Sequence, residues 1–222
     1  MDVARDQALA QHLRVQNLPA IRVIDQGQMV EQLEGPQGER ALRALLDGLT
    51  MSSGDLLRAQ LKDILAAGDF RTAMDLLRQA LEAEPNNLSF KVEYADVLAI
   101  MGEVEQARTT LAGIPEGTEN RDRPATRIEF TEEAAGMPKA EEIAAALAAN
   151  EKDLEARYQA AVRAAVAGEA EAALEHAMFI LRTNRKFRDD IGRTTMVRIF
   201  TLLGKGSELA SSYRRQMFNY MH

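Results

Sequence analysis

Cysteine is absent from all 222 residues of the sequence. A chain without cysteine has no disulfide, no thiolate nucleophile, no CxxC redox pair and no thiolate ligand for a metal. Histidine is almost as scarce, because His12, His176 and His222 lie far apart and none has a second histidine at the spacing of a metal-ligand pair. We therefore expect no metal site and no histidine-based catalytic site.

Aromatic residues, long apolar runs and catalytic motifs are also scarce or absent, which limits the classes of protein to which the sequence can belong. Tryptophan is absent and aromatic residues make up only 5% of the chain, while the abundance of alanine and leucine favours helix over sheet. No apolar run reaches the roughly 18 residues that would predict a membrane span. The sequence also contains no glycine-rich phosphate loop and no Ser–His–Asp pattern, so we expect no cofactor and no enzyme activity.

The composition that remains is typical of a folded protein, with 46% hydrophobic and 27% charged residues. The net charge of −7 argues against general binding to nucleic acid. The charge is uneven, because residues 182–222 hold nine Lys or Arg against three Asp or Glu, and the rest of the chain holds 18 against 31. This basic end either attracts an acidic protein or RNA, or is a solvated face with cations near helix C-termini.

The first fifty residues predict the order helix–strand–strand–helix. Residues 6–15 show an apolar helical face, and two strand-like runs follow at 20–24 and 29–33. A leucine stripe in residues 39–49 indicates a second helix. Because two strands do not form an independently stable sheet, we interpret this segment as half of a larger domain.

After a predicted linker at residues 51–54, every segment predicts helix and an internal repeat appears. Within residues 67–73, a glycine is followed directly by an acidic and an apolar residue, and an alanine lies three positions after the apolar one. The same pattern recurs within residues 101–107, a shift of 34. It recurs again at 167–173, a further shift of 66. Glycine suits a tight turn between antiparallel helices, and a small alanine lets the second helix approach the first. This period and these offsets are typical of the tetratricopeptide repeat.

Four further predicted helices complete the chain: a degenerate pair between the second and third units, and two closing helices that cap the solenoid. Their ranges are 124–135, 139–149, 187–203 and 208–221. The predicted fold class is therefore mainly α, a tetratricopeptide-like helical solenoid over residues 54–222. A partial α/β segment with the order helix–strand–strand–helix precedes it over residues 1–50.

The N-terminal segment resembles the C-terminal half of a thioredoxin fold. Val15-x-x-Leu18-Pro19-Ala20 resembles the loop that carries a cis-proline before the fourth strand, and Arg22-Val23-Ile24-Asp25-x-Gly27 resembles that strand and its turn. A complete domain of this kind would add strands and helices upstream of Asp2. We therefore expect the chain to be a fragment in which Met1 is not the native start. Its half-sheet would then expose an apolar face and an unpaired edge, so the segment would pack on the repeats, form a dimer or be loosely ordered.

The end of the chain resembles the closing helices of the bacterial chaperedoxins, thioredoxin-like co-chaperones with C-terminal tetratricopeptide repeats. The resemblance is carried by Phe187-Arg188-Asp189-Asp190, Arg193, Ile199-Phe200, Leu202-Leu203-Gly204 and Tyr213-Arg214-Arg215. It implies a cytoplasmic holdase that binds unfolded client proteins and hands them to the bacterial chaperonin, which the last helix engages. Two alternatives stay open: a fragment of a thiol–disulfide oxidoreductase whose redox motif lies upstream, and a plain tetratricopeptide scaffold.

Three groups of residues are candidates for protein contacts. On the last helix, Tyr213 and Met217 are expected to face the core. The candidate protein-contact residues of this helix are Tyr213, Arg214, Arg215, Phe218, Tyr220 and Met221. On the first helices of the repeats, aromatic residues either line a concave peptide groove or simply pack between helices, and these are Phe90, Tyr94 and Tyr158. Pro19 is the cis-proline candidate, which the resemblance places against substrate polypeptide, the alternative being a rigid loop.

Overall fold

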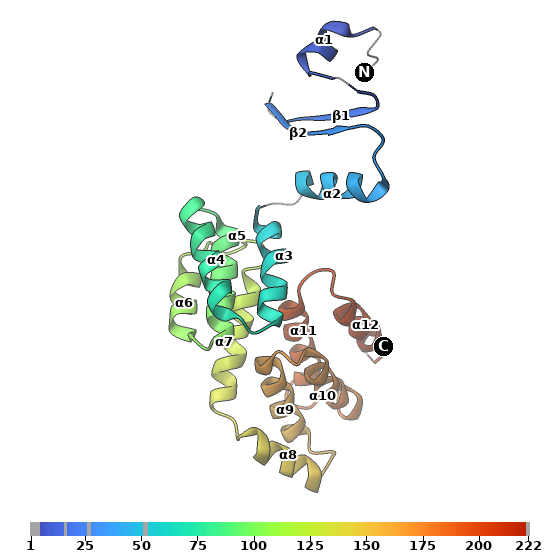
Figure 1. The fold of residues 1–222 in the computed structure, drawn as a ribbon. Coiled ribbons are helices and arrows are strands. Elements are labelled where there is room, and N and C mark those ends of the chain that lie inside the picture. The colour runs from blue at the N-terminus through green and yellow to red at the C-terminus, as the bar shows by residue number, and fades with distance from the viewer. Residues whose placement is uncertain (1–4, 16, 26–27, 51–52, 221–222) are drawn as a thin grey trace. The chain divides into compact units, whose positions relative to one another are not determined.

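The computed structural model describes residues 5–15, 17–25, 28–50 and 53–220. The chain divides into two compact units, residues 1–55 and 56–222 (Figure 1). Of the predicted linker, Met51 and Ser52 lie outside the described residues. The prediction is wrong for Ser53 and Gly54, because both already belong to helix α3 (Ser53–Ala66). Along the described chain, no helix has the length and apolarity needed to cross a bilayer.

The N-terminal unit has the predicted order helix–strand–strand–helix. Its elements are α1 (Gln7–His12), β1 (Ala20–Asp25), β2 (Gln28–Glu34) and α2 (Glu39–Thr50). The strands are antiparallel, and the register slips after Val23 so that Ile24 pairs with Met29 and Val30 forms a bulge. Helix α1 is shorter than predicted, because Arg14 adopts a positive φ of 51°, which no α-helix continues through.

Arg22 on β1 fastens α1 to the hairpin. Its side chain is only 5% exposed and forms an ion pair with Glu34 on β2. Its Nε donates to the Leu13 carbonyl oxygen at 3.0 Å and its Nη2 to the Arg14 carbonyl oxygen at 3.2 Å. Leu13 and Arg14 directly follow α1, so the guanidinium ties the turn at the end of this helix to the hairpin.

The hairpin exposes apolar side chains, as expected for a half-sheet. Ile24, Met29 and Val30 are all exposed, and so is Leu18 in the loop before β1. The Leu18–Pro19 peptide bond is cis and Pro19 is exposed. Dimerisation through this surface and contact of Pro19 with a substrate stay predictions.

In the C-terminal unit, most successive helices run antiparallel to one another (Figure 1). After α3 the helices are α4 (Phe70–Ala83), α5 (Leu88–Ile100), α6 (Val104–Ala112), α7 (Asp122–Ala135), α8 (Ala140–Ala149), α9 (Leu154–Ala167), α10 (Ala170–Thr183), α11 (Ile191–Leu203) and α12 (Glu208–Phe218). Helices α7 and α8 are the pair predicted to be degenerate. Helix α7 packs on α5, α6, α9 and α11, whereas α8 packs on α9.

The repeat markers have the predicted roles. The three glycines all adopt a left-handed conformation at the turns between paired helices, with φ of 71° at Gly68, 81° at Gly102 and 80° at Gly168. The three alanines that follow are fully buried; they are Ala73, Ala107 and Ala173. A larger side chain at these alanines would hold the two helices of a unit apart. The sequence pattern therefore located the turns and the tight helix contacts correctly.

The closing helices are shorter than predicted. Helix α11 begins at Ile191 rather than Phe187, because Arg188, Asp189 and Asp190 all have positive φ and form a turn. In that turn Arg188 reaches Glu155, with Nη1 2.9 Å from Oε1, and stacks over the ring of Tyr158. Helix α12 ends at Phe218, three residues before the predicted end.

Helix α7 lies between two apolar clusters of the C-terminal unit. The first is formed by side chains of α3 to α6 and includes Ile128 of α7. The second is formed by side chains of α9 to α12 and includes Phe130 of α7. Ile128 and Phe130 are two positions apart, which on an α-helix corresponds to a rotation of about 200°, so their side chains point to opposite sides of α7. Helix α7 therefore joins the two halves of the unit.

A buried ion-pair network ties α7 to α5 and α3. Glu93 and Asp96 of α5 are 3% and 5% exposed. Asp96 pairs with Arg123 at 3.1 Å and with Arg127 at 2.9 Å, both on α7. Glu93 pairs with Arg123 at 2.5 Å and with Arg58 of α3 at 2.8 Å. Burying two carboxylates is costly unless cations surround them, so the three arginines make the packing of these helices specific.

Replacing one of these carboxylates tests the network. We expect Glu93→Gln to lower the free energy of unfolding by about 3 kcal/mol, because two arginines lose a buried counter-charge. The control is Glu132→Gln, which removes a surface pair with Arg108 and should cost less than about 1 kcal/mol. Urea unfolding followed by circular dichroism measures both; equal losses would contradict the account.

Candidate protein-binding site

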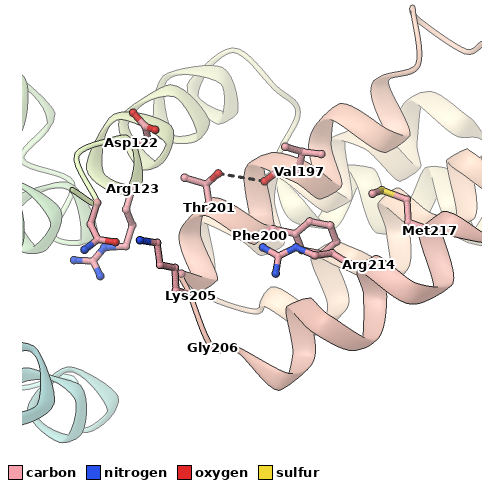
Figure 2. A pocket seen from close by; sticks show the side chains of 11 residues that line it. Asp122, Arg123, Val197, Phe200, Thr201, Lys205, Gly206, Arg214 and Met217 are labelled. Atoms are coloured by element: carbon pink, nitrogen blue, oxygen red, sulfur yellow. Dashed lines mark hydrogen bonds between the residues drawn. The ribbon is translucent and has the colours of Figure 1, made fainter. Parts of the chain in front are cut away.

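A hollow of about 570 Å³ lies between the N-terminal end of α7, the C-terminal half of α11 and helix α12. We call it the α7–α11–α12 hollow. Figure 2 shows its lining: Val197 and Phe200 come from α11, Arg214 and Met217 from α12, and Lys205 from the turn between those helices. The hollow therefore combines an apolar floor with basic side chains.

The position of α11 beside α7 is fixed by Arg198. Its guanidinium lies 3.8 Å from the ring centroid of Phe130, and Nη1 pairs with Glu133 at 2.9 Å. Glu129, one turn earlier on α7, lies 3.7 Å from Nε of the same arginine. A cation between an aromatic face and two carboxylates holds two helices in one register. Helix α11, one wall of the hollow, is thus held against helix α7, which forms another.

The apolar floor of the hollow is open to solvent in part. Val197 is 43% exposed, whereas Phe200 beneath it is buried. The Phe200 ring is covered on one face by the Arg214 guanidinium, 4.9 Å from its centroid, and Figure 2 shows this stacking. Met217 is partly buried and packs against the same apolar cluster. An incoming apolar side chain would bury the exposed part of this floor.

The basic side chains of the hollow differ in how they are paired. Arg123 belongs to the buried network with Glu93 and Asp96. Lys205 pairs with Glu119 at 2.8 Å, and this hydrogen bond and charge raise the pKa of Lys205. Arg214 forms no ion pair with any carboxylate that the structure describes, and stacking on Phe200 is its contact. Arg214 is therefore the cation most available to a ligand.

Helix α12 presents two different faces, as predicted. Tyr213 is buried in the apolar cluster, where burial and the nearby carboxylates of Glu175 and Glu171 raise its pKa. Phe218 is 62% exposed and Tyr220 is 46% exposed, the latter under Arg182 of α10 at 5.1 Å. Met221, also a candidate, lies outside the described residues. Exposure confirms the predicted facing of these side chains, while their contact with a partner stays a prediction.

The predicted groove aromatics are not gathered in one groove. Phe90 is 4% exposed and Tyr158 is 2% exposed, and both are core residues. The prediction that they line a peptide groove is therefore wrong, and the alternative of packing between helices is correct. Tyr94 is partly buried and lines a different hollow of about 490 Å³ between α4, α5 and α6.

Sequence reasoning missed Arg123, Val197 and Lys205 as parts of one site. Lys205 stands between Gly204 and Gly206, both of which adopt positive φ at the turn between α11 and α12. A lysine between two glycines at a helix turn is a visible signal of an exposed cation. No pattern in the sequence placed that turn beside the start of α7, some 80 residues earlier. In the described part of the chain, no three His, Asp or Glu side chains form a group suited to a metal ion.

Two models of the tetratricopeptide repeat match the sequence, one over residues 65–126 and the other over residues 133–222. The chain contains tetratricopeptide repeats. The hollow lies within the tetratricopeptide region, and such repeats imply protein partners. Neither match extends to residues 1–64, so the thioredoxin-like resemblance of the N-terminal unit stays a prediction.

One solved structure similar to this tetratricopeptide chain is a domain of protein VP0806, of unknown function, from Vibrio parahaemolyticus RIMD 2210633. The sequences are 28% identical, the match covers 73% of this chain and 96% of that one, and the TM-score is 0.34. No curated protein matches the sequence significantly.

The two faces of α12 predict opposite effects of mutation. We expect Tyr213→Ala to lower the free energy of unfolding by about 3 kcal/mol, because it leaves a cavity in the cluster. Phe218→Ala should change it by less than about 0.5 kcal/mol, because most of this side chain is already in water. Thermal unfolding of both variants measures the difference, and a large loss for Phe218→Ala would show that α12 packs by the other face.

Proposed function

We propose that this chain is a protein-binding scaffold without catalytic activity, and that it binds partners through α12 and the α7–α11–α12 hollow. The observation that carries the proposal is the coincidence of three features at one end of the tetratricopeptide region. These are the hollow with its apolar floor, Arg214, which has no ion pair among the described residues, and the exposed aromatic side chains of Phe218 and Tyr220. Aromatic and arginine side chains are enriched among the residues that dominate binding energies.

Site-specific photo-crosslinking tests this placement. A benzoylphenylalanine at position 218 should give discrete adducts in a lysate of the source organism, and an excess of unmodified chain should suppress them. The control is the same probe at Lys152, an exposed residue in the turn between α8 and α9. Equal labelling at both positions, or no suppression by the unmodified chain, would contradict the proposal.

A narrower function, that of a co-chaperone, is supported by apolar exposure in both units. Ile24, Met29 and Val30 on the hairpin and Phe218 on α12 are exposed. Apolar side chains held in solvent are the surface that a holdase needs for unfolded clients, because burial of apolar area drives such binding. We infer that the hairpin contributes to client binding and that α12 contacts a chaperonin.

Two assays separate the co-chaperone from a plain scaffold. The chain at several-fold molar excess should suppress light scattering by a chemically denatured enzyme. It should also co-elute with purified bacterial chaperonin on a sizing column, and deletion of residues 207–222 should abolish co-elution. Because α12 buries Ala210 and Tyr213 in the apolar cluster, circular dichroism must show that the rest of the truncated chain is still folded. Absence of suppression would exclude the holdase function. Absence of co-elution by the whole chain would exclude the chaperonin contact.

A further inference from the structure

The α7–α11–α12 hollow has the chemistry to select its ligand. We propose that it binds an internal peptide segment in which acidic and bulky apolar side chains alternate, with a side-chain carboxylate on Arg214. This inference rests on the proposed function, because it names the class of partner for the same surface.

The apolar part of the ligand is indicated by the floor. Val197 is exposed beside the buried ring of Phe200, and Met217 closes the floor along α12. A leucine-sized side chain would cover Val197 and contact the thioether, which adapts to irregular shapes. Burial of its apolar surface would favour binding. This part of the hollow therefore favours an apolar residue over a charged one.

The positive charges of Arg214 and Lys205 indicate that the ligand contains acidic side chains. Arg214 is exposed, and its guanidinium keeps its hydrogen-bond donors while stacked on Phe200. Stacking fixes the plane of the guanidinium, so less side-chain entropy is lost when a carboxylate binds. Lys205 is exposed on the same hollow and pairs with Glu119 at the surface. A ligand carboxylate can replace Glu119 there, since exposed pairs are weak.

The opposite wall contains one acidic side chain. Asp122 lies in the first turn of α7, where the helix dipole favours its charge. It repels a carboxylate placed at that wall and so directs the acidic side chains of a ligand toward α12. The cations belong to two elements, the turn at Lys205 and helix α12. That separation suits charges distributed along a segment rather than a single terminal carboxylate.

Fluorescence anisotropy with three labelled, C-terminally amidated decapeptides tests the inference. In these probes leucine alternates with glutamate, glutamine or lysine. The glutamate peptide should bind at least about tenfold more tightly than the glutamine peptide, which is the ratio expected for one charge-assisted contact. Raising the salt concentration should narrow that ratio. Equal binding of the glutamate and glutamine peptides would overturn the inference.

Matched variants assign the contact to one residue. Arg214→Gln should weaken binding of the glutamate peptide about tenfold, and Arg214→Lys should recover only part of that loss, because lysine keeps the charge but not the stacked, planar guanidinium. Arg215→Gln removes the same charge from the next residue, which is exposed but outside the hollow, and should change affinity less than about twofold. Equal losses for Arg214→Gln and Arg215→Gln would overturn the inference, because only net charge would then matter.

Failure of this inference is distinguishable from failure of the proposed function. Crosslinking at position 218 without a preference for the glutamate peptide would overturn the ligand class and leave the scaffold intact. Loss of both the crosslinks and all peptide binding would overturn both. A further probe is the glutamine peptide with a free C-terminal carboxylate in place of the amide. If its affinity equalled that of the glutamate peptide, the hollow would recognise chain ends, and this result would overturn the proposed internal segment.

Discussion

The packing of helix α7 is the constraint on which the C-terminal unit depends. On one side Arg123 and Arg127 hold the buried carboxylates of α5, and on the other side Glu133 and Glu129 hold Arg198 of α11. The two apolar clusters meet at this helix and nowhere share a buried side chain. Breaking a buried ion pair costs more than the pair contributes, so these contacts exclude other arrangements of α7.

The same constraint creates the candidate site. Because α7 is not paired closely with α8, its N-terminal end stands opposite the closing hairpin of α11 and α12. A regular repeat at this point would pack its own second helix on α7. The degenerate pair instead leaves space, which Arg214, Lys205 and Val197 line. The proposed binding surface thus lies where the repeat is irregular, and residues of the basic end of the chain, Lys205 and Arg214, line it.

Local patterns predicted the elements well, and tertiary contacts decided the rest. Gly68, Gly102 and Gly168 revealed the turns, because few residues other than glycine adopt positive φ readily. The predicted start of α11 was wrong, because Arg188, Asp189 and Asp190 adopt positive φ although none is glycine, in a turn where Arg188 makes a long-range ion pair with Glu155. Phe90 and Tyr158 were ambiguous because an aromatic residue on a groove-facing helix and one in the core follow the same period. The hollow itself joins residues from distant helices, and no local spacing encodes that proximity.

Methyl chemical-shift mapping during titration with the glutamate peptide tests the central claim most directly. Two hollows of the repeat region contain methionine, so the protein has an internal control: Met217 lines the α7–α11–α12 hollow, and Met74 and Met101 line the hollow near Tyr94. The account predicts saturable shifts of the methyl groups of Met217 and Val197, with Met74 and Met101 unchanged. Shifts at Met74 and Met101 without shifts at Met217 would place binding at the other hollow and contradict it.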